Sequence, residues 1–266
     1  KKMIYQVAVG KPSRLYERCI QSVADYCELH QIDHIVQREP ILRIQPDPFN
    51  CGRSKEATAR LGYLPIFEKE NAFGYLDDYD QIAIVDSDIW IRPGSTNIFD
   101  DLDPSVDFAG VVEREMPVTS EYGSKIQNYS RMQYQTLDKI DWYWNHAYGG
   151  QFFNMGLMVM NKSIKNHLKG NTPKQFIERA EFKDFVDGVG SWKWSTDQTL
   201  LNYWVRNSNM KYQKLNWKWN GLFKGIKDSK IAECNFVHFF LKSKLPGGGE
   251  DFDSLIDNMS NIKGFK

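Results

Sequence analysis

A short apolar run that stops at two carboxylates is the feature that most constrains this chain. Residues 81–90 read QIAIVDSDIW, so the apolar residues from Ile82 to Val85 are followed at once by Asp86 and Asp88. A continuous rather than alternating apolar run is typical of a strand covered on both faces, as in a parallel sheet flanked by helices. Side chains two positions apart on an extended chain point to the same side, so we expect the two carboxylates to lie together.

Two like charges at the end of a buried strand repel each other and resist desolvation unless a cation or a cluster of donors meets them. Ligands bind beyond the carboxyl ends of strands in open α/β sheets, so the pair indicates a divalent-metal site. The pattern alone is weak, because Asp86 could cap a turn while Asp88 pairs with a nearby arginine. Three other Asp-x-Asp pairs lie in polar, turn-like surroundings and are expected to be surface charges: 78/80, 101/103 and 251/253.

The order of the predicted elements indicates a doubly wound α/β sheet. Strands are predicted at 3–9, 33–37, 81–88, 108–112, 151–161, 211–219 and 234–241. Helices are predicted from Pro12-Ser13 onwards and at 54–71, 163–180 and 195–206. Residues 114–150 differ, since they are rich in Tyr, Trp, Asn and Gln and poor in aliphatic residues, and such an insertion is more often a functional loop or lid than filler.

The composition argues against several classes of protein. Lys plus Arg equals Asp plus Glu at 34 each, so there is no overall basic field for a polyanion, and nucleic acid is not expected as a partner. No stretch approaches the ~18 consecutive apolar residues of a membrane span. The four cysteines lack CxxC spacing, which argues against a zinc cluster or a disulfide scaffold and favours a reducing cytoplasm. Cys19 and Cys27 are expected on the buried face of the first helix.

Six segments, in chain order, resemble glycosyltransferase family 8, the glycogenin-like and bacterial galactosyltransferase-like enzymes of the GT-A fold. They are TARLGYL (58–64), IAIVDSDIWI (82–91), FFNMGLMVMN (152–161), STDQTLLN (195–202), NWKWNG (216–221) and VHFFLKSK (237–244). In that family a strand ending in Asp-x-Asp is followed by a Phe-Asn-x-Gly strand, an Asp-Gln helix start, a Lys/Arg-Trp-Asn segment and a His-Phe-x-Gly-x-x-Lys-Pro-Trp ending. Each piece is weak, and the resemblance depends on their order.

The resemblance implies a metal site and a donor site. Asp86, Asp88 and His238 would hold Mn²⁺, or alternatively Mg²⁺; a mixed carboxylate and imidazole set suits Mn²⁺ better. Asp197 and Gln198 would be the catalytic pair that faces the sugar and its anomeric carbon. The implied substrate-binding residues are Arg60, near the donor sugar and the metal-binding carboxylates, Asn154 on the sugar, Lys244 on a phosphate oxygen, and Gly10 and Trp219.

Two departures from the family pattern concern the nucleotide. Leu241 replaces the family glycine and Leu245-Pro246 replaces Pro-Trp, so the loop over the diphosphate is expected to follow another path. Near the N-terminus the family has acidic residues and a Tyr that read uracil, whereas this chain has Gly10-Lys11. The base is therefore open, with UDP as the first expectation, and Tyr16 is either a platform for the base or a helix residue facing the core.

Each site residue also has a purely structural interpretation. His238 lies in an apolar strand and could be a hydrogen-bonded core histidine. Ser195-x-x-Gln198 matches a capping box, which would start a helix without any contact to a sugar. The remaining alternatives are an exposed helix position for Arg60, a strand-end hydrogen bond for Asn154 and a solvated charge for Lys244.

The resemblance predicts an α/β, GT-A-type, Rossmann-like single domain over residues 1–246 with a mixed, mostly parallel sheet flanked by helices. Residues 1–113 would be the nucleotide-binding half, 114–150 an acceptor or lid insertion, 151–246 the sugar and acceptor half, and 247–266 a short tail. Acceptor contact is assigned to ring side chains of the insertion, and the alternative is an ordered surface insertion packed on the sheet. These rings are Tyr134, Trp142, Tyr143, Trp144 and His146.

The predicted function is metal-dependent, retaining transfer of a hexose from a nucleotide-diphosphate sugar to a saccharide, glycolipid or glycoprotein. No strong carboxylate nucleophile is evident, so a front-face route through a short-lived ion pair is expected rather than a covalent intermediate. One alternative is a sugar nucleotidyltransferase, whose glycine-rich phosphate loop has only a faint trace in Gly10-Lys11. The other is a non-catalytic nucleotide- or sugar-binding module on the same scaffold.

Overall fold

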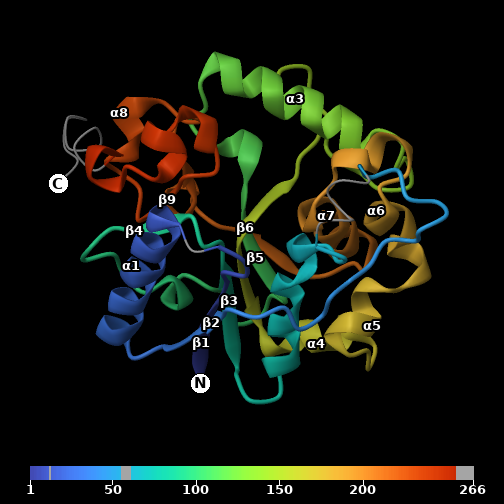
Figure 1. Cartoon of the computed structure of the whole chain (residues 1–266), viewed down its shortest axis with the longest axis horizontal. Coiled ribbons are helices and arrows are strands. Elements are labelled where there is room, and N and C mark those ends of the chain that lie inside the picture. The colour runs from blue at the N-terminus through green and yellow to red at the C-terminus, as the bar shows by residue number, and fades with distance from the viewer. Residues whose placement is uncertain (12, 55–60, 256–266) are drawn as a thin grey trace.

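A six-stranded mixed sheet forms the centre of the molecule (Figure 1). The computed structural model describes residues 1–11, 13–54 and 61–255, and its strand order is β2-β1-β3-β6-β5-β7. Strand β6 is antiparallel to both of its neighbours, and the other strands of this sheet run in one direction. The strands are β1 (Lys2–Val7), β2 (Asp33–Gln37), β3 (Gln81–Val85), β5 (Phe108–Val112), β6 (Phe153–Asn161) and β7 (Tyr212–Lys214). The predicted mixed, mostly parallel sheet is confirmed.

Helices cover both faces of this sheet, which explains the continuous apolar run in β3. Ala83 and Val85 face one core together with residues of α1 (Arg14–His30). Ile82 and Ile84 face the opposite core together with residues of α7 (Asp197–Asn207). Full burial of an Ile or Val side chain contributes about 1.5–3 kcal/mol, so β3 is apolar from Ile82, after its first residue, to its end at Val85.

Helix α1 begins where the sequence predicts. The side chain of Ser13 accepts a backbone N–H of the first turn at 3.1 Å and so caps the helix. The helix ends at Gln31, which adopts a left-handed conformation with φ 55°. Cys19 and Cys27 are buried, as expected.

A second, three-stranded sheet joins distant parts of the chain in the order β4-β9-β8. Its strands are β4 (Ile89–Ile91), β8 (Gly221–Leu222) and β9 (Phe236–His238). Ile89, directly after the Asp-x-Asp pair, is the register partner of His238 in the antiparallel β4–β9 pairing. This sheet brings the end of β9 beside the turn that follows β3.

The helix predicted at 54–71 is wrong for the residues that the structure describes. Residues 55–60 lie outside the described residues, and the chain beyond them forms 3₁₀ turns at Pro65–Phe67 and Lys69–Tyr75. Pro65 at the start of the first turn lacks the N–H that a helix crossing this position would need.

Several further predictions were too long. The strand predicted at 234–241 is shortened to β9, Phe236–His238. The predicted helix at 163–180 is broken into α4 (Lys165–Leu168) and α5 (Pro173–Ile177), because Lys169 and Gly170 adopt positive φ angles of 53° and 75°. The strand predicted at 211–219 is shorter in the structure, where it forms only β7, and Trp217–Trp219 forms a 3₁₀ turn.

Residues 114–150 contain a helix that the sequence analysis did not predict. Helix α3 (Ser120–Tyr134) is capped by Thr119 and covers one edge of the molecule (Figure 1). Tyr122, Ile126 and Tyr129 face inward at helical spacing. The helical periodicity is hard to recognise in the sequence, because this stripe is mostly aromatic and lies in a polar segment. Short helices α6 (Lys183–Asp187) and α8 (Asp228–Ile231) lie on opposite sides of the molecule. Among the described helices, none combines the length and the hydropathy needed to cross a bilayer.

Candidate functional site

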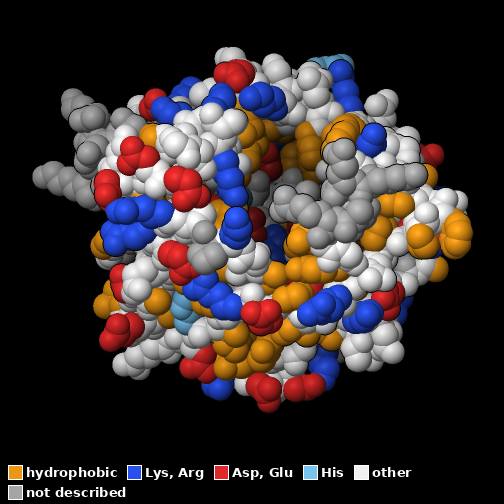
Figure 2. Space-filling view, in the orientation of Figure 1, with side chains coloured by type: hydrophobic (Ala, Val, Ile, Leu, Met, Phe, Trp, Pro, Cys, Tyr) orange, Lys and Arg blue, Asp and Glu red, His pale blue; other side chains and the backbone are white. Residues whose placement is uncertain are grey.

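A cavity of about 630 Å³ lies beyond the carboxyl ends of β1 and β3. Figure 2 shows this hollow near the middle of one face, with acidic side chains inside it and hydrophobic side chains around it. It is lined by residues of several elements: Val7 at the end of β1 with Ala8 and Val9 after it, Asp86–Asp88 after β3, Asn154–Gly156 of β6, Asp197 and Gln198 of α7, and Tyr122, Lys125, Ile126 and Tyr129 of α3. This is the position at which open α/β sheets bind ligands.

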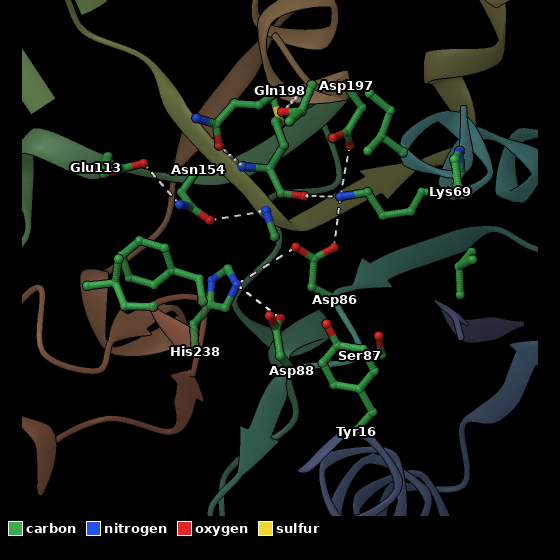
Figure 3. A pocket seen from close by; sticks show the side chains of 18 of the residues that line it. Tyr16, Lys69, Asp86, Ser87, Asp88, Glu113, Asn154, Asp197, Gln198 and His238 are labelled. Atoms are coloured by element: carbon green, nitrogen blue, oxygen red, sulfur yellow. Dashed lines mark hydrogen bonds and ion pairs between the residues drawn. The ribbon is translucent and has the colours of Figure 1, made fainter. Parts of the chain in front are cut away.

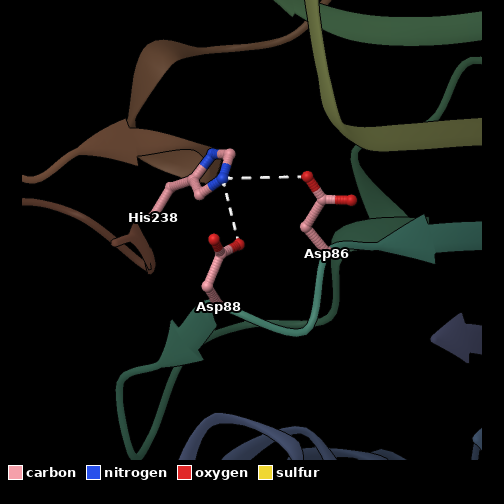
Figure 4. Close-up of side chains that lie close together, drawn as sticks. All are labelled: Asp86, Asp88 and His238. Carbon is pink, nitrogen blue, oxygen red and sulfur yellow. Dashed lines mark ion pairs between the residues drawn. The ribbon is translucent and has the colours of Figure 1, made fainter. Parts of the chain in front are cut away.

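The structure brings Asp86, Asp88 and His238 together at the floor of this cavity (Figure 4). His238 Nε2 lies 3.2 Å from Asp88 Oδ1 and 3.8 Å from Asp86 Oδ2. One ligand atom from each residue lies within 4.8 Å of the others. Two carboxylate oxygens and one imidazole nitrogen around a single point form a donor set that fits a divalent cation such as Mn²⁺.

His238 and Asp88 stabilise each other's charge. Burial alone would lower the pKa of His238, but the charge and hydrogen bond of Asp88 together with the charge of Asp86 outweigh burial, and the pKa is raised. Burial alone would raise the pKa of Asp88, but the charge and hydrogen bond of His238 outweigh it, and the pKa is lowered. Both shifts favour the charged form of the group, so His238 and Asp88 are arranged as an ion pair in the absence of a metal. A bound cation would take the place of the Nε2 proton.

Lys69 is a site residue that the sequence analysis missed (Figure 3). Its Nζ lies 2.8 Å from Asp86 Oδ1 and 2.8 Å from Asp197 Oδ2, and it donates to the carbonyl of Met155 at 3.1 Å. Burial would lower the pKa of Lys69, but the charges of Asp197 and Asp86 outweigh it, so the pKa is raised. Lys69 thus makes the carboxylate contact that the resemblance assigned to Arg60, which lies outside the described residues.

Asp197 and Gln198 both line the cavity at the start of α7. Burial raises the pKa of Asp197, and Lys69 opposes this effect. The capping-box alternative is wrong, because Thr196 is the N-cap and its hydroxyl accepts from the Gln198 N–H at 3.3 Å. The Gln198 side-chain oxygen instead accepts from the backbone N–H of Met155 at 3.0 Å, which fixes it against β6.

The other predicted substrate-binding residues are placed differently. Asn154 lines the cavity and is buried. Trp219 is buried in the core, and its indole N–H donates to Asp101 Oδ2 at 2.8 Å, so its neighbour Asn220 is the residue of that segment that contacts His238. Lys244 pairs with Glu121 of α3 at 3.1 Å and is not among the residues lining the cavity. Gly10 follows the lining residue Val9 and has a φ of 106°.

The ring side chains proposed for acceptor contact do not line this cavity. Tyr134 and Trp142 are buried and stack on each other with ring centroids 4.3 Å apart. Tyr143 and Trp144 are exposed outside the cavity. The insertion instead reaches the cavity through the inward stripe of α3, and its role as lid or acceptor platform stays a prediction.

Comparison with solved structures identifies the fold. No protein-family profile matches the sequence, and no curated protein matches it. A glycosyltransferase involved in glycosylation of the major capsid of PBCV-1 superposes with a TM-score of 0.53 at 12% identity, over 96% of this chain and 98% of that chain. The galactosyltransferase LgtC, in complex with donor and acceptor sugar analogs, superposes with a TM-score of 0.53 at 12% identity, over 98% of this chain and 96% of that chain. The chain therefore has the GT-A-type glycosyltransferase fold, as the sequence predicted.

Proposed function

We propose that the chain is a cation-dependent, retaining glycosyltransferase that moves a hexose from a nucleotide-diphosphate sugar, with UDP as the nucleotide, to a saccharide or glycoconjugate. The observation that carries this proposal is the convergence of Asp86, Asp88 and His238 in a cavity that also holds Asp197 and Gln198. The fold shared with glycosyltransferases supports it.

Asp86, Asp88 and His238 would hold the cation, for which we propose Mn²⁺ with Mg²⁺ as the alternative. When bound, the cation would supply positive charge to the diphosphate leaving group, whose negative charge grows as the glycosidic bond breaks. Lys69 pairs with both Asp86 and Asp197 and holds the two carboxylates in place.

Asp197 and Gln198 are the residues that we assign to the sugar. The carboxylate of Asp197 is paired with Lys69, which weakens it as a nucleophile and leaves it to orient sugar hydroxyls. The Gln198 oxygen, held by the Met155 N–H, would face the anomeric carbon and stabilise positive charge that develops on the ring. This arrangement supports a front-face route with retention rather than a covalent intermediate.

The nucleotide is assigned to the opposite end of the cavity. Val7–Val9 and Tyr16 line it there, and the Lys242 Nζ lies 3.9 Å from the centre of the Tyr16 ring. An aromatic face beside apolar side chains suits a planar base. We therefore propose Tyr16 as the base platform, in place of its alternative role as a core residue.

A thermal-shift screen of UDP-, GDP- and CDP-hexoses with and without Mn²⁺ tests this function. At a hundredfold excess over Kd, a specific ligand stabilises by about 2.7 kcal/mol, so Tm should rise by roughly 5 °C or more with a UDP-hexose plus Mn²⁺. Slow Mn²⁺-dependent hydrolysis of the same sugar nucleotide should follow. Pyrophosphate release from a nucleoside triphosphate and a sugar phosphate would indicate the nucleotidyltransferase alternative, and binding without hydrolysis would indicate the non-catalytic one.

Gly156 is expected to be essential because the His238 ring packs directly on it. A Cβ at this position would lie 2.3 Å from His238 Cε1, far inside contact distance. Gly156→Ala should displace the ring, cost about 1–3 kcal/mol of stability and weaken Mn²⁺ binding. Urea unfolding and Mn²⁺ titration measure the two effects. Gly74→Ala is the matched control, since its Cβ would meet the nearest atom at an ordinary 3.6 Å; unchanged Mn²⁺ affinity in Gly156→Ala would contradict the proposed ligand.

A further inference from the structure

A line of buried hydrogen bonds leads from His238 to helix α3, and Figure 3 shows its step from Asn154 to Glu113. The Nδ1 atom of His238 lies 3.0 Å from Asn220 Oδ1. Asn220 Nδ2 donates to Asn154 Oδ1 at 2.9 Å, and Asn154 Nδ2 donates to Glu113 Oε2 at 2.9 Å. The hydroxyl of Tyr122 donates to the other oxygen of Glu113. We call this set the Asn220 relay: His238, Asn220, Asn154, Glu113 and Tyr122.

Donors and acceptors in the Asn220 relay have a fixed order, because two independent contacts set the orientation of the Asn154 amide. The Glu113 carboxylate accepts from Asn154 Nδ2 and from the Tyr122 hydroxyl, so it acts as the acceptor end. The backbone N–H of Gly156 donates to Asn154 Oδ1 at 3.1 Å, which holds the amide oxygen in place whatever the charge on Glu113. Turning the Asn154 amide over would set an NH₂ group against this N–H.

The orientation of Asn154 fixes the orientation of Asn220. Since Asn154 presents an oxygen, Asn220 must present its NH₂ group to it, and its own oxygen then faces His238. An oxygen accepts only, so Nδ1 of His238 must carry a proton and donate it. The other ring nitrogen, Nε2, faces Asp86 and Asp88.

We infer that Asn220 is a positioning residue: it accepts the Nδ1–H of His238 and thereby presents the Nε2 lone pair to a cation between Asp86 and Asp88. Metal-binding histidines generally donate their second N–H to such a partner, which sets the tautomer and the ring angle. This inference depends on the proposed cation site. It also gives the NWKWNG segment a role, in which Trp219 packs the core and Asn220 orients the ligand.

Two substitutions of Asn220 separate its effect on the orientation of the His238 ring from its effect on core packing. Asn220→Leu removes the acceptor at similar shape. Asn220→Asp retains an acceptor for Nδ1–H and loses only the donation to Asn154 Oδ1. Electron paramagnetic resonance measures free Mn²⁺ and so gives the Mn²⁺ affinity, and spin-echo modulation detects the ¹⁴N of a directly bound imidazole. We expect wild type and Asn220→Asp to show the ¹⁴N coupling, and Asn220→Leu to bind Mn²⁺ about 10- to 100-fold more weakly with the coupling reduced or lost.

Asn161→Leu is the matched control. Asn161 is a buried asparagine at the other end of β6, and its amide donates to the backbone carbonyls of Asp103 and Val106. The Asn161→Leu variant should have a lower free energy of unfolding than wild type and the same Mn²⁺ affinity. Equal affinity and equal ¹⁴N coupling in Asn220→Leu and wild type would overturn the inference, and so would an equal loss in Asn220→Leu and Asn220→Asp.

The failure of the inference can be told apart from failure of the proposed function. If wild-type protein binds Mn²⁺ without ¹⁴N coupling, His238 is not a ligand, and the proposed cation site fails together with the inference. If the coupling is present in wild type but insensitive to Asn220, only the inference fails. Should Asn220→Leu not fold, the Mg²⁺-loaded wild type still tests the relay, because the Nδ1–H of His238 should exchange slowly with solvent in NMR spectra, and fast exchange would overturn the inference.

Discussion

Asp88→Ala will lose cation-dependent turnover of the sugar nucleotide by about 10³-fold or more, which corresponds to ~4 kcal/mol of transition-state stabilisation. The reason is the loss of one of the three proposed ligands of the cation, whose charge would neutralise the leaving diphosphate. The fold should persist, since Asp88 follows the buried strand and its backbone carbonyl, which accepts from the Phe239 N–H at 2.9 Å, is retained. Donor hydrolysis measured with and without Mn²⁺ reports the effect.

Asp253→Ala is the control for this substitution. Asp253 belongs to another Asp-x-Asp pair, is exposed and makes a surface ion pair with Arg14. Its removal should leave turnover unchanged. Near-normal Mn²⁺-dependent turnover in Asp88→Ala would refute the metal assignment.

Lys69→Met will destabilise the protein by about 3–5 kcal/mol, because two carboxylates in a mostly buried site lose their shared counter-charge. Urea unfolding measures this loss. Lys165→Met is the control, since Lys165 pairs with Asp77 at the surface, where an ion pair contributes only ~0–1 kcal/mol. An equally small effect of both substitutions would show that Lys69 does not hold the site together.

The loss of unfolding free energy in Lys69→Met should depend on pH, and its direction can be predicted. Burial already raises the pKa of Asp197, and removing Lys69 removes the charge that opposes this rise. A carboxyl group whose pKa is higher in the folded than in the unfolded state binds more protons when folded, so stability falls as pH rises. The difference from wild type should therefore be largest near neutral pH and shrink as pH falls toward the unfolded carboxyl pKa of about 4.

The parts of the fold that the sequence predicted well have strong local signals. Strand β3 is apolar from Ile82 to Val85 because both of its faces are covered, and α1 carries a Ser13 cap and an apolar stripe. The context of the Asp-x-Asp pairs was also informative. The carboxylates at 78/80, 101/103 and 251/253 are exposed, as expected, and only the pair at 86/88 ends a buried strand.

The missed site residues depend on contacts between distant segments. Lys69 lies in a segment that resembles a surface helix, and its partner Asp197 is 128 positions further along the chain. Asn220 follows Trp219, the residue that the sequence analysis selected, and only the packing of the 3₁₀ turn decides which of the two side chains contacts His238. Helix α3 was hidden because its inward face is largely aromatic. In each case tertiary structure, not local pattern, determines the role.

An anomalous-scattering map of crystals soaked with Mn²⁺ and UDP is the most direct measurement of the central assignment. A manganese peak should lie between the carboxylates of Asp86 and Asp88 and the Nε2 atom of His238, with the diphosphate of UDP on its open side. Manganese bound elsewhere, or a nucleotide bound away from this peak, would contradict sugar transfer at this site.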